Sequence, residues 1–426
     1  MSKRLLNDLQ KLVTSGVISQ ENADAIEVYY QTNRKDQPNL MMIIFGVLGA
    51  LLIGLGIILI LAHNWDAFSR WQKTVIAFLP MVVGQVICGF TLWKKNESVA
   101  WREASSTFLV FAIGACISLI SQIYHIEGSM AGFMLIWTVL TLPVIYVMRS
   151  SMASLLYLLG ITYYGCETGY FNPANHSPLV YWLLLLLALP YYVHLIRKQP
   201  DGNATLFHHV FIPLSIIICL GIFAKDAGLL MMPAYLFLFG ILYFISQSSL
   251  FEGKKWMQNP YLVLSSMGTL FLLFMLSFEG YWKELFEKKS ELLSPFFSFE
   301  MSIALLLFAV YGFLLWQKRA HFNPIKYVAL GSLIAFFLAW VSPVPPIVII
   351  NIMILVIGIY FIRAGSANHQ LGLMNYGLLT IAILIACRFF DIELSFVTRG
   401  ILFVLLGVGF FVANYFLMKK AQKKEE

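Results

Sequence analysis

The side chains best suited to chemistry lie where apolar segments end. The first such segment, residues 40–62, is followed at once by a histidine, an amide, a tryptophan and a carboxylate. Three later segments end in similar groups, and the four clusters comprise His63, Asn64, Trp65 and Asp66; Gln122, His125 and Glu127; Glu167, Asn172, Asn175 and His176; and Arg388, Asp391, Glu393 and Arg399. Two histidines beside a carboxylate could perform acid–base chemistry or bind a metal ion if these segment ends converge.

The same residues also have a purely structural interpretation. Polar groups beside Trp and Tyr are usual where helices leave a bilayer, and Arg388 with Asp391 could be no more than an ion pair within one helix. The chain has no HExxH, P-loop, GxSxG or CxxC motif, so we expect no metal or cofactor and leave catalysis open. The candidate substrate-binding residues are His63, Asn64, Trp65, Asp66, Gln122, His125, Glu127, Arg388, Asp391 and Arg399.

The elements that position these residues are predicted to be membrane helices. The 426-residue chain is 59% hydrophobic and 12% charged, whereas a soluble domain has roughly 25% charged residues. The net charge is +7, and the lysines and arginines lie in short clusters between apolar segments, a pattern typical of the loops of membrane proteins. We therefore expect membrane lipids as partners and no nucleic acid.

Fourteen apolar segments follow residue 39, most of them long enough to cross a bilayer as a helix. They occupy residues 40–62, 74–93, 106–124, 130–148, 151–166, 178–196, 207–223, 228–246, 259–278, 300–316, 325–341, 346–362, 371–387 and 397–417. With both termini in the cytoplasm, this arrangement leaves most of the 29 lysines and arginines inside, as the positive-inside rule requires. Omitting the weak segment 151–166 would divide the lysines and arginines almost evenly between the two sides of the membrane. Fourteen helices are therefore favoured over thirteen. With fourteen helices, all four polar clusters face outside.

The ends of the chain are predicted to be cytoplasmic. Residues 3–31 have the pattern of a soluble helical hairpin, in which Ser15-Gly16 breaks the first helix and Ser19 is the N-cap of the second. We expect a hairpin and linker over 1–39, a transmembrane helical domain over 40–417 and a basic tail over 418–426. The hairpin could bind a cytoplasmic protein or pack on its own membrane domain. Residues 279–294 are predicted to form a helix in the outer membrane interface.

The absence of charged residues in the middle of the predicted spans and the absence of CxxC pairs reduce the number of possible functions. No Asp, Glu, Lys or Arg lies near the middle of a predicted span, which argues against an ion-coupled pump. The five cysteines lie in or beside apolar segments without a CxxC pair, so we predict small buried side chains and neither disulfides nor a sulfur-ligated metal.

Three separated motifs carry a family resemblance. LVTSGVISQENADAI, GLGIILILAHNWDAFSRWQK and FAIGACISLISQIYHIEG occur in this order, and the first 150 residues resemble a bacterial membrane-protein family catalogued as domain of unknown function 2157. The later helices, which end in CRFFDIELSFVTRGILFVLLG, look like the multi-span regions that accompany it. The resemblance implies a polytopic inner-membrane protein with a short cytoplasmic N-terminal domain, and it transfers no catalytic residue.

The sequence therefore predicts an all-α, polytopic helical membrane protein and leaves three functions open. The favoured one is a transporter-like or lipid-handling protein of the inner membrane with an outward-facing polar site. The alternatives are a non-catalytic scaffold or sensor and, least favoured, an enzyme that acts on a lipid-linked substrate with His63 or His125 as base. If the outer site exists, His63 and His125 should lie within about 8 Å of each other, so that both contact one ligand. The oligomeric state is left open.

Overall fold

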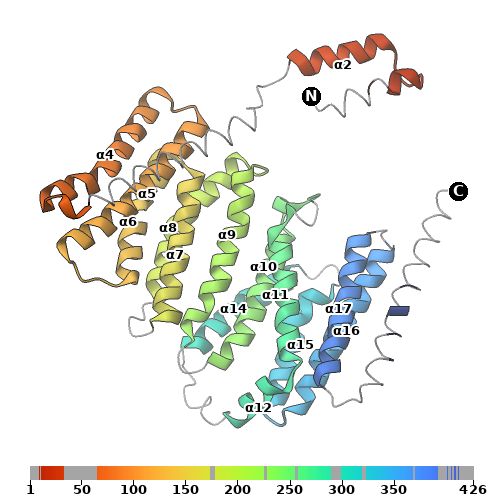
Figure 1. Cartoon of the computed structure of the whole chain (residues 1–426). Helices are drawn as coiled ribbons and strands as arrows, with labels where there is room; N and C mark the ends of the chain where they lie inside the picture. Colours follow the sequence, from red (N-terminus) through yellow and green to blue (C-terminus); the bar gives the residue numbers. More distant parts are fainter. Residues whose placement is uncertain are drawn as a thin grey trace. The chain divides into compact units, whose positions relative to one another are not determined.

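The computed structural model describes residues 9, 11–32, 65–172, 178–224, 228–254, 258–288, 299–318, 323–367 and 370–391, with five single positions between 401 and 411. Every element of secondary structure in these ranges is a helix (Figure 1). The chain divides into two compact units, Met1–Ile76 and Ala77–Glu426. The predicted all-α membrane fold is confirmed at this level.

The first unit contains the predicted turn between two helices. A helical turn over residues 11–14 ends at Ser15, and Gly16 follows with a positive φ of 74°, a conformation that glycine adopts without steric cost. The next helix, α2 (Gln20–Thr32), begins where Ser19 Oγ accepts a hydrogen bond of 3.2 Å from the Asn22 amide. The break at Ser15-Gly16 and the N-cap at Ser19 are therefore confirmed.

The second unit is a bundle in which each predicted segment from the second to the thirteenth forms a helix. The main helices are α4 (Arg70–Lys94, which begins in the first unit), α5 (Val99–Tyr124), α6 (Met130–Met148), α7 (Ser151–Cys166), α8 (Pro178–Lys198), α9 (Asn203–Leu220), α10 (Met231–Ser246), α11 (Pro260–Leu276), α12 (Glu279–Glu287), α14 (Phe299–Gln317), α15 (Pro324–Ala339), α16 (Val344–Ala367) and α17 (Leu371–Asp391). Short helical turns η2 (Glu167–Phe171), η4 (Gly221–Phe223), η5 (Gly228–Leu230) and η6 (Ser249–Phe251) extend or connect them.

Nine helices of the described ranges are long and apolar enough to cross a membrane, or ten if α11 and α12 count as one bent span. The first predicted segment, 40–62, and most of the last, 397–417, lie outside the described residues. The count of fourteen therefore stays a prediction. The doubtful fifth segment is helix α7, and η2 prolongs it to Phe171.

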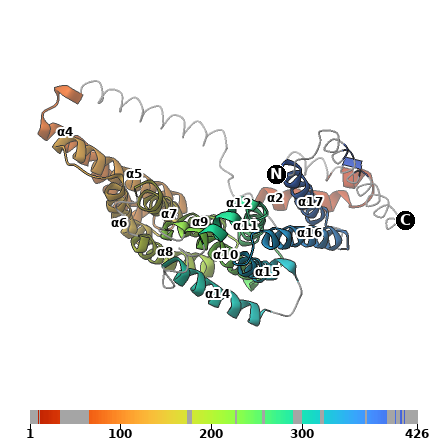
Figure 2. The same ribbon diagram turned by 90° about the horizontal axis from the view of Figure 1, so that it is seen from below.

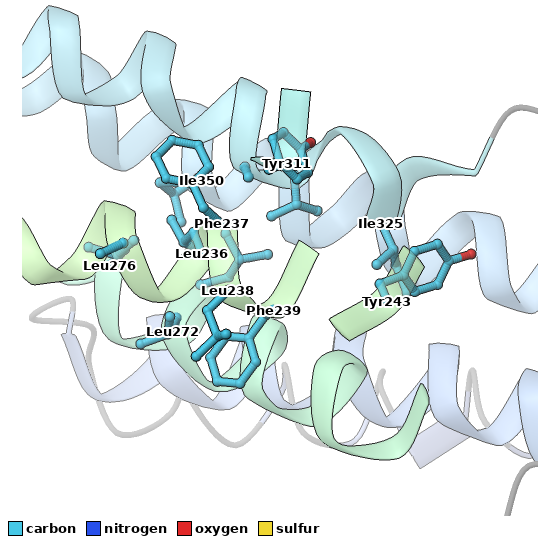
Figure 3. Packing of buried hydrophobic residues seen from close by; sticks show 14 of the residues in the cluster. Leu236, Phe237, Leu238, Phe239, Tyr243, Leu272, Leu276, Tyr311, Ile325 and Ile350 are labelled. Carbon is cyan, nitrogen blue, oxygen red and sulfur yellow. The ribbon is translucent and has the colours of Figure 1, made fainter. Parts of the chain in front are cut away.

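Two hydrophobic clusters form the core of the second unit. One is built mainly from α5 to α9, and the other mainly from α10, α11 and α14 to α16. In the second cluster Phe237 of α10 packs against Tyr311 of α14, with ring centroids 5.7 Å apart, and Ile350 of α16 belongs to the same cluster (Figure 3). Helix α9 contacts helices of both clusters, since it packs on α7 and also on α10 and α11 (Figures 1 and 2).

The predicted interfacial segment begins as helix α12, which is bent by 68° from α11. Its Trp282 is fully buried, and the indole N–H donates to the Leu276 carbonyl at 2.6 Å. Tyr281 donates to the Leu229 carbonyl at 2.7 Å. These bonds attach α12 to neighbouring helices of the bundle, while its position relative to a bilayer stays a prediction.

Candidate functional site

The first predicted cluster is described in part. Trp65 and Asp66 lie in the short helix η1 (Trp65–Ala67) of the first unit, where Lys73 Nζ lies 5.5 Å from the centre of the Trp65 ring and Asp66 is exposed. His63 and Asn64 lie outside the described residues, as do Asn175, His176, Glu393 and Arg399. The 8 Å approach of His63 to His125 therefore stays a prediction.

The second predicted cluster is organised by the end of helix α5. His125 caps this helix in the left-handed conformation, and its Nδ1 lies 2.9 Å from the carbonyl oxygen of Gln122. Gln122, His125 and Glu127 are all exposed. The structure thus brings Gln122 and His125 together through local helix geometry, and the imidazole is held by its own helix.

Of the other two predicted clusters, one makes a contact within its own segment and the other makes a contact between helices. Glu167 is buried in η2 and accepts a hydrogen bond from the amide of Asn172. Arg388, in the last turn of α17, donates from Nη2 to Ser277 Oγ at 3.1 Å and lies 4.9 Å from the centre of the Phe278 ring. Asp391 ends the same helix, but its side chain is outside the described part. A single ligand site shared by the four clusters stays a prediction.

A larger set of buried and half-buried polar groups lies at the opposite helix ends and includes none of the candidate residues predicted from the sequence. We call these the inner ends, because the predicted topology places them in the cytoplasm, and we call the others the outer ends. We name the set the serine–histidine network; it comprises Glu103, Ser106, Ser150, Ser151, Ser154, Tyr191, Tyr192, His208, His209 and Tyr261. Its residues come from α5, α7, α8, α9 and α11 and from the turn before α7.

Glu103 of α5 holds the beginning of helix α7. Its carboxylate accepts hydrogen bonds from Ser150 Oγ at 2.5 Å, from the Ser151 amide at 2.9 Å and from the Met152 amide at 2.8 Å. The first amides of a helix have no partner within the helix, and the helix dipole is positive there. A carboxylate from another helix therefore satisfies these donors and attaches α5 to α7. Ser106 completes the junction by donating to Ser150 Oγ at 2.6 Å.

His208 is fully buried and connects α9 to α7. Its Nε2 lies 2.9 Å from Ser154 Oγ and its Nδ1 lies 2.8 Å from the Ala204 carbonyl oxygen. The carbonyl can only accept, so Nδ1 carries the proton; in the neutral imidazole, Nε2 then accepts from the serine hydroxyl. Both nitrogens are satisfied by the protein.

His209 points to a different group of helices. Its Nδ1 lies 2.5 Å from the hydroxyl of Tyr192 on α8, and this hydroxyl lies 2.9 Å from that of Tyr261 on α11. Successive residues are 100° apart around a helix, so the two adjacent histidines reach partners on different sides of α9. Since Tyr192 belongs to one hydrophobic cluster and Tyr261 to the other, this node joins the two clusters.

One nitrogen of a cation beside the network lacks such a partner. The Nε of Arg102 is buried and has no hydrogen-bond partner among the described residues. Arg102 directly precedes Glu103 on α5, and its carbonyl accepts a hydrogen bond of 2.7 Å from Ser106 Oγ of the network. By contrast, Lys254 at the same inner end forms an ion pair of 2.9 Å with Asp201. The Nε–H of the Arg102 guanidinium could therefore donate a hydrogen bond to an anion.

The comparison with family models supports the membrane assignment. Residues 10–154 match the family described as predicted membrane protein (DUF2157). This match confirms the resemblance over the first 150 residues. No curated protein and no solved structure shows significant similarity to the chain. The DUF2157 region contains Glu103, Ser150 and Ser154, whereas both histidines of the network lie beyond it.

The network carries few of the features that marked the candidate residues in the sequence, which were charge and a position outside the apolar segments. Its only acid is Glu103, and Tyr191-Tyr192 and His208-His209 fall within predicted spans. Histidines adjacent to each other near the start of an apolar segment were a usable signal. In the residues that the structure describes, no group of three His, Cys, Asp or Glu is placed to bind a metal ion.

Proposed function

We propose that this polytopic helical membrane protein is transporter-like or lipid-handling and binds the anionic headgroup of an amphipathic molecule beside the serine–histidine network. The observation that carries the proposal is the buried Nε of Arg102, which has no partner in the described part of the chain. A buried donor of a charged group left without an acceptor costs about 1–3 kcal/mol or more. An anionic oxygen of a ligand would remove that cost.

The surroundings of Arg102 favour an amphipathic ligand. The network leaves few donors for a ligand besides Arg102, because its own serines, histidines and tyrosines hydrogen-bond to one another. The neighbouring inner ends carry the basic residues Lys94, Lys95, Arg149, Arg197 and Lys198, which attract anionic headgroups. Exposed apolar side chains on α4 and α5, among them Phe90, Phe108 and Phe111, provide a surface for acyl chains.

The junction at His209 suits a protein that changes shape. The two hydrophobic clusters meet there through hydrogen bonds of Tyr192 and Tyr261, and transporters commonly move one helical bundle against another. The proposal also includes the bacterial inner membrane as location and a cytoplasmic position for both termini, as the charge pattern indicates.

Native mass spectrometry in defined lipid tests the proposal. The full chain is released from nanodiscs of phosphatidylglycerol or of phosphatidylcholine, and retained lipid is counted for the wild type, Arg102→Gln and the control Arg197→Gln. Arg197 is exposed and lies at the same inner end, so the control removes an equal charge. We expect retained phosphatidylglycerol to fall at least about tenfold in Arg102→Gln only, since an ionic hydrogen bond contributes 1.5–3 kcal/mol. Equal retention in both variants would refute the inner site.

The same experiment tests the predicted outer site. A His63→Ala/His125→Ala variant should lose a retained species if the outer residues His63, Asn64, Trp65, Asp66, Gln122, His125, Glu127, Arg388, Asp391 and Arg399 form a binding site. A transporter requires ligand contacts at both faces, so loss in both variants would support transport. Loss in Arg102→Gln alone would favour lipid handling at the inner face.

The scaffold function remains a second candidate because of the N-terminal hairpin. Leu12, Val17 and Val28 are exposed in the first unit, as expected of a segment that binds a cytoplasmic protein. Deleting residues 1–31 separates the two functions. If the inner site is the functional one, the deletion should leave lipid retention unchanged. If the protein is a scaffold, the deletion should abolish its cellular role, and lipid retention should be the same in the wild type and in the Arg102 and His125 variants.

A further inference from the structure

Helices α7 and α9 are parallel neighbours with a constant register. Ser154 of α7 contacts His208 of α9, and Thr162 Oγ1 lies 2.6 Å from Ser215 Oγ. The partners are separated by 54 and 53 residues along the chain. An offset that stays nearly constant over two helical turns requires helices that run in the same direction, as predicted for spans that both lead from inside to outside.

The same register brings two cysteines together at the outer end. One turn after Thr162 and Ser215, the next residues on the facing sides are Cys166 and Cys219. Cys219 Sγ donates to the carbonyl of Thr162, one turn before Cys166, at 3.7 Å. The Cys219 sulfur therefore lies against the turn of α7 that ends at Cys166. Neither cysteine is part of a disulfide in the structure.

A glycine allows this close approach. A Cβ added at Gly165, the neighbour of Cys166, would lie 2.9 Å from Cys219 Sγ, which is closer than carbon and sulfur can come. Small residues let helix backbones approach closely in membranes, and a disulfide requires Cβ atoms about 3.5–4.5 Å apart. The packing therefore brings the Cys219 sulfur against the backbone of α7 at the residue next to Cys166.

Although the sequence predicted no disulfide, we propose that Cys166 and Cys219 are a redox pair that forms a reversible disulfide between α7 and α9. The predicted topology places this end outside, where disulfides form and persist. Cys166 is the partly exposed member and Cys219 the buried one, so Cys166 meets the oxidant first. The bond locks together the two helices whose inner ends carry Ser154 and His208.

The oxidant is a disulfide, small or protein-borne, and the reaction is thiol–disulfide exchange. The Cys166 thiolate attacks one sulfur of the oxidant, a mixed disulfide forms and one thiolate leaves. The Cys219 thiolate then attacks the Cys166 sulfur and displaces the second thiolate. Two protein thiols are oxidised to one disulfide, the oxidant is reduced to two thiols, and the two protons from the cysteines pass to those thiols.

Thiol counting in the full-length protein tests the pair. Membranes are treated with oxidised glutathione, denatured in N-ethylmaleimide, and the protein is analysed by intact mass and by peptide mapping. The untreated chain should take up five maleimides, one for each cysteine. The oxidised chain should take up two fewer and yield a peptide joined through Cys166 and Cys219. Dithiothreitol should restore all five.

Variants identify the role of each sulfur. Cys219→Ser should stop at the mixed disulfide and carry one glutathione at Cys166. Cys387→Ser, which removes another partly buried cysteine, should still lose two maleimide sites on oxidation. The proposal is overturned if the wild type retains five reactive thiols, if it stops with glutathione on Cys166, or if the bridged peptide contains another cysteine. Because the wild-type measurement alone can overturn the proposal, the test does not depend on the folding of any variant.

Discussion

The inner and outer ends of the helical bundle hold their polar side chains in different ways. At the outer end of α5, His125 and Gln122 are exposed and bind within one turn of the same helix. At the inner ends, the buried His208 and the half-buried Glu103 are bonded across helices, to Ser154 and to the start of α7. An exposed polar group needs no partner because water supplies one, but a buried group must find one in the protein. Buried polar groups therefore fix how helices pack.

The largest effect should come from Glu103, because it satisfies three donors. Glu103→Gln should lower the free energy of unfolding by about 3 kcal/mol, since hydrogen bonds to a charged acceptor contribute 1.5–3 kcal/mol and the amide places a donor against a helix start. The measurement is the midpoint of thermal unfolding in detergent. Glu127→Gln, which changes an exposed glutamate, is the control. Equal midpoints for the two variants would contradict the comparison.

His208 should come next. His208→Phe preserves an aromatic ring but leaves the Ser154 hydroxyl without its partner and removes the side-chain bond to the Ala204 carbonyl, which should cost about 2 kcal/mol. His125→Phe at the outer end should stay within about 0.5 kcal/mol of the wild type, as surface substitutions usually do. Thermal unfolding of both variants in the same detergent measures the difference. A larger loss for His125→Phe would reverse our assignment of the structural histidine.

The junction between the two hydrophobic clusters should have a smaller but cooperative effect. Tyr192→Phe and Tyr261→Phe both remove the hydroxyl–hydroxyl bond, and Tyr192→Phe also removes the bond to His209. Tyr261→Phe should cost about 1 kcal/mol and Tyr192→Phe about 1–2 kcal/mol. Because they share that bond, the double variant should lose less than the sum of the two single losses. Strict additivity in this double-mutant cycle would show that the hydroxyls do not interact. Tyr163→Phe, an exposed tyrosine on α7, is the control.

The smallest effect is expected at the outer end of α17. Arg388→Lys removes the bond from Nη2 to Ser277 and weakens the cation–ring contact with Phe278. Lysine cannot reproduce the planar guanidinium, and partly exposed contacts of this kind contribute about 0.5–1 kcal/mol. The same thermal measurement applies. A loss larger than that of His208→Phe would show that the outer end, too, depends on contacts between helices.

The helical architecture was largely predictable. Apolar segments bounded by polar residues predicted the positions of α4 to α17 closely, because a bilayer permits few structures other than helices. Local signals also succeeded at Ser19 and at Gly16, where the cap and the break depend on neighbouring residues alone. The candidate outer residues were chosen from the same local evidence, and their grouping into one site stays a prediction.

Contacts between helices could not be predicted in this way. Helices α5 to α9 are apolar nearly all round, so their sequences carry little information about which side faces a neighbour. The pairs Glu103 with Ser150, Ser154 with His208 and Tyr192 with Tyr261 join residues 47, 54 and 69 positions apart. No short-range pattern connects such positions.

The order of amino acids alone accounts for the helices, their approximate ends and the membrane environment, because these depend on the hydrophobicity and polarity of consecutive residues. Packing in three dimensions accounts for the serine–histidine network, the unpaired Nε of Arg102 and the approach of Cys219 to the turn of α7 before Cys166. These features depend on the rotation and register of one helix against another. Those two variables are set by the fit of many side chains at once, which is why they emerge only from the folded chain.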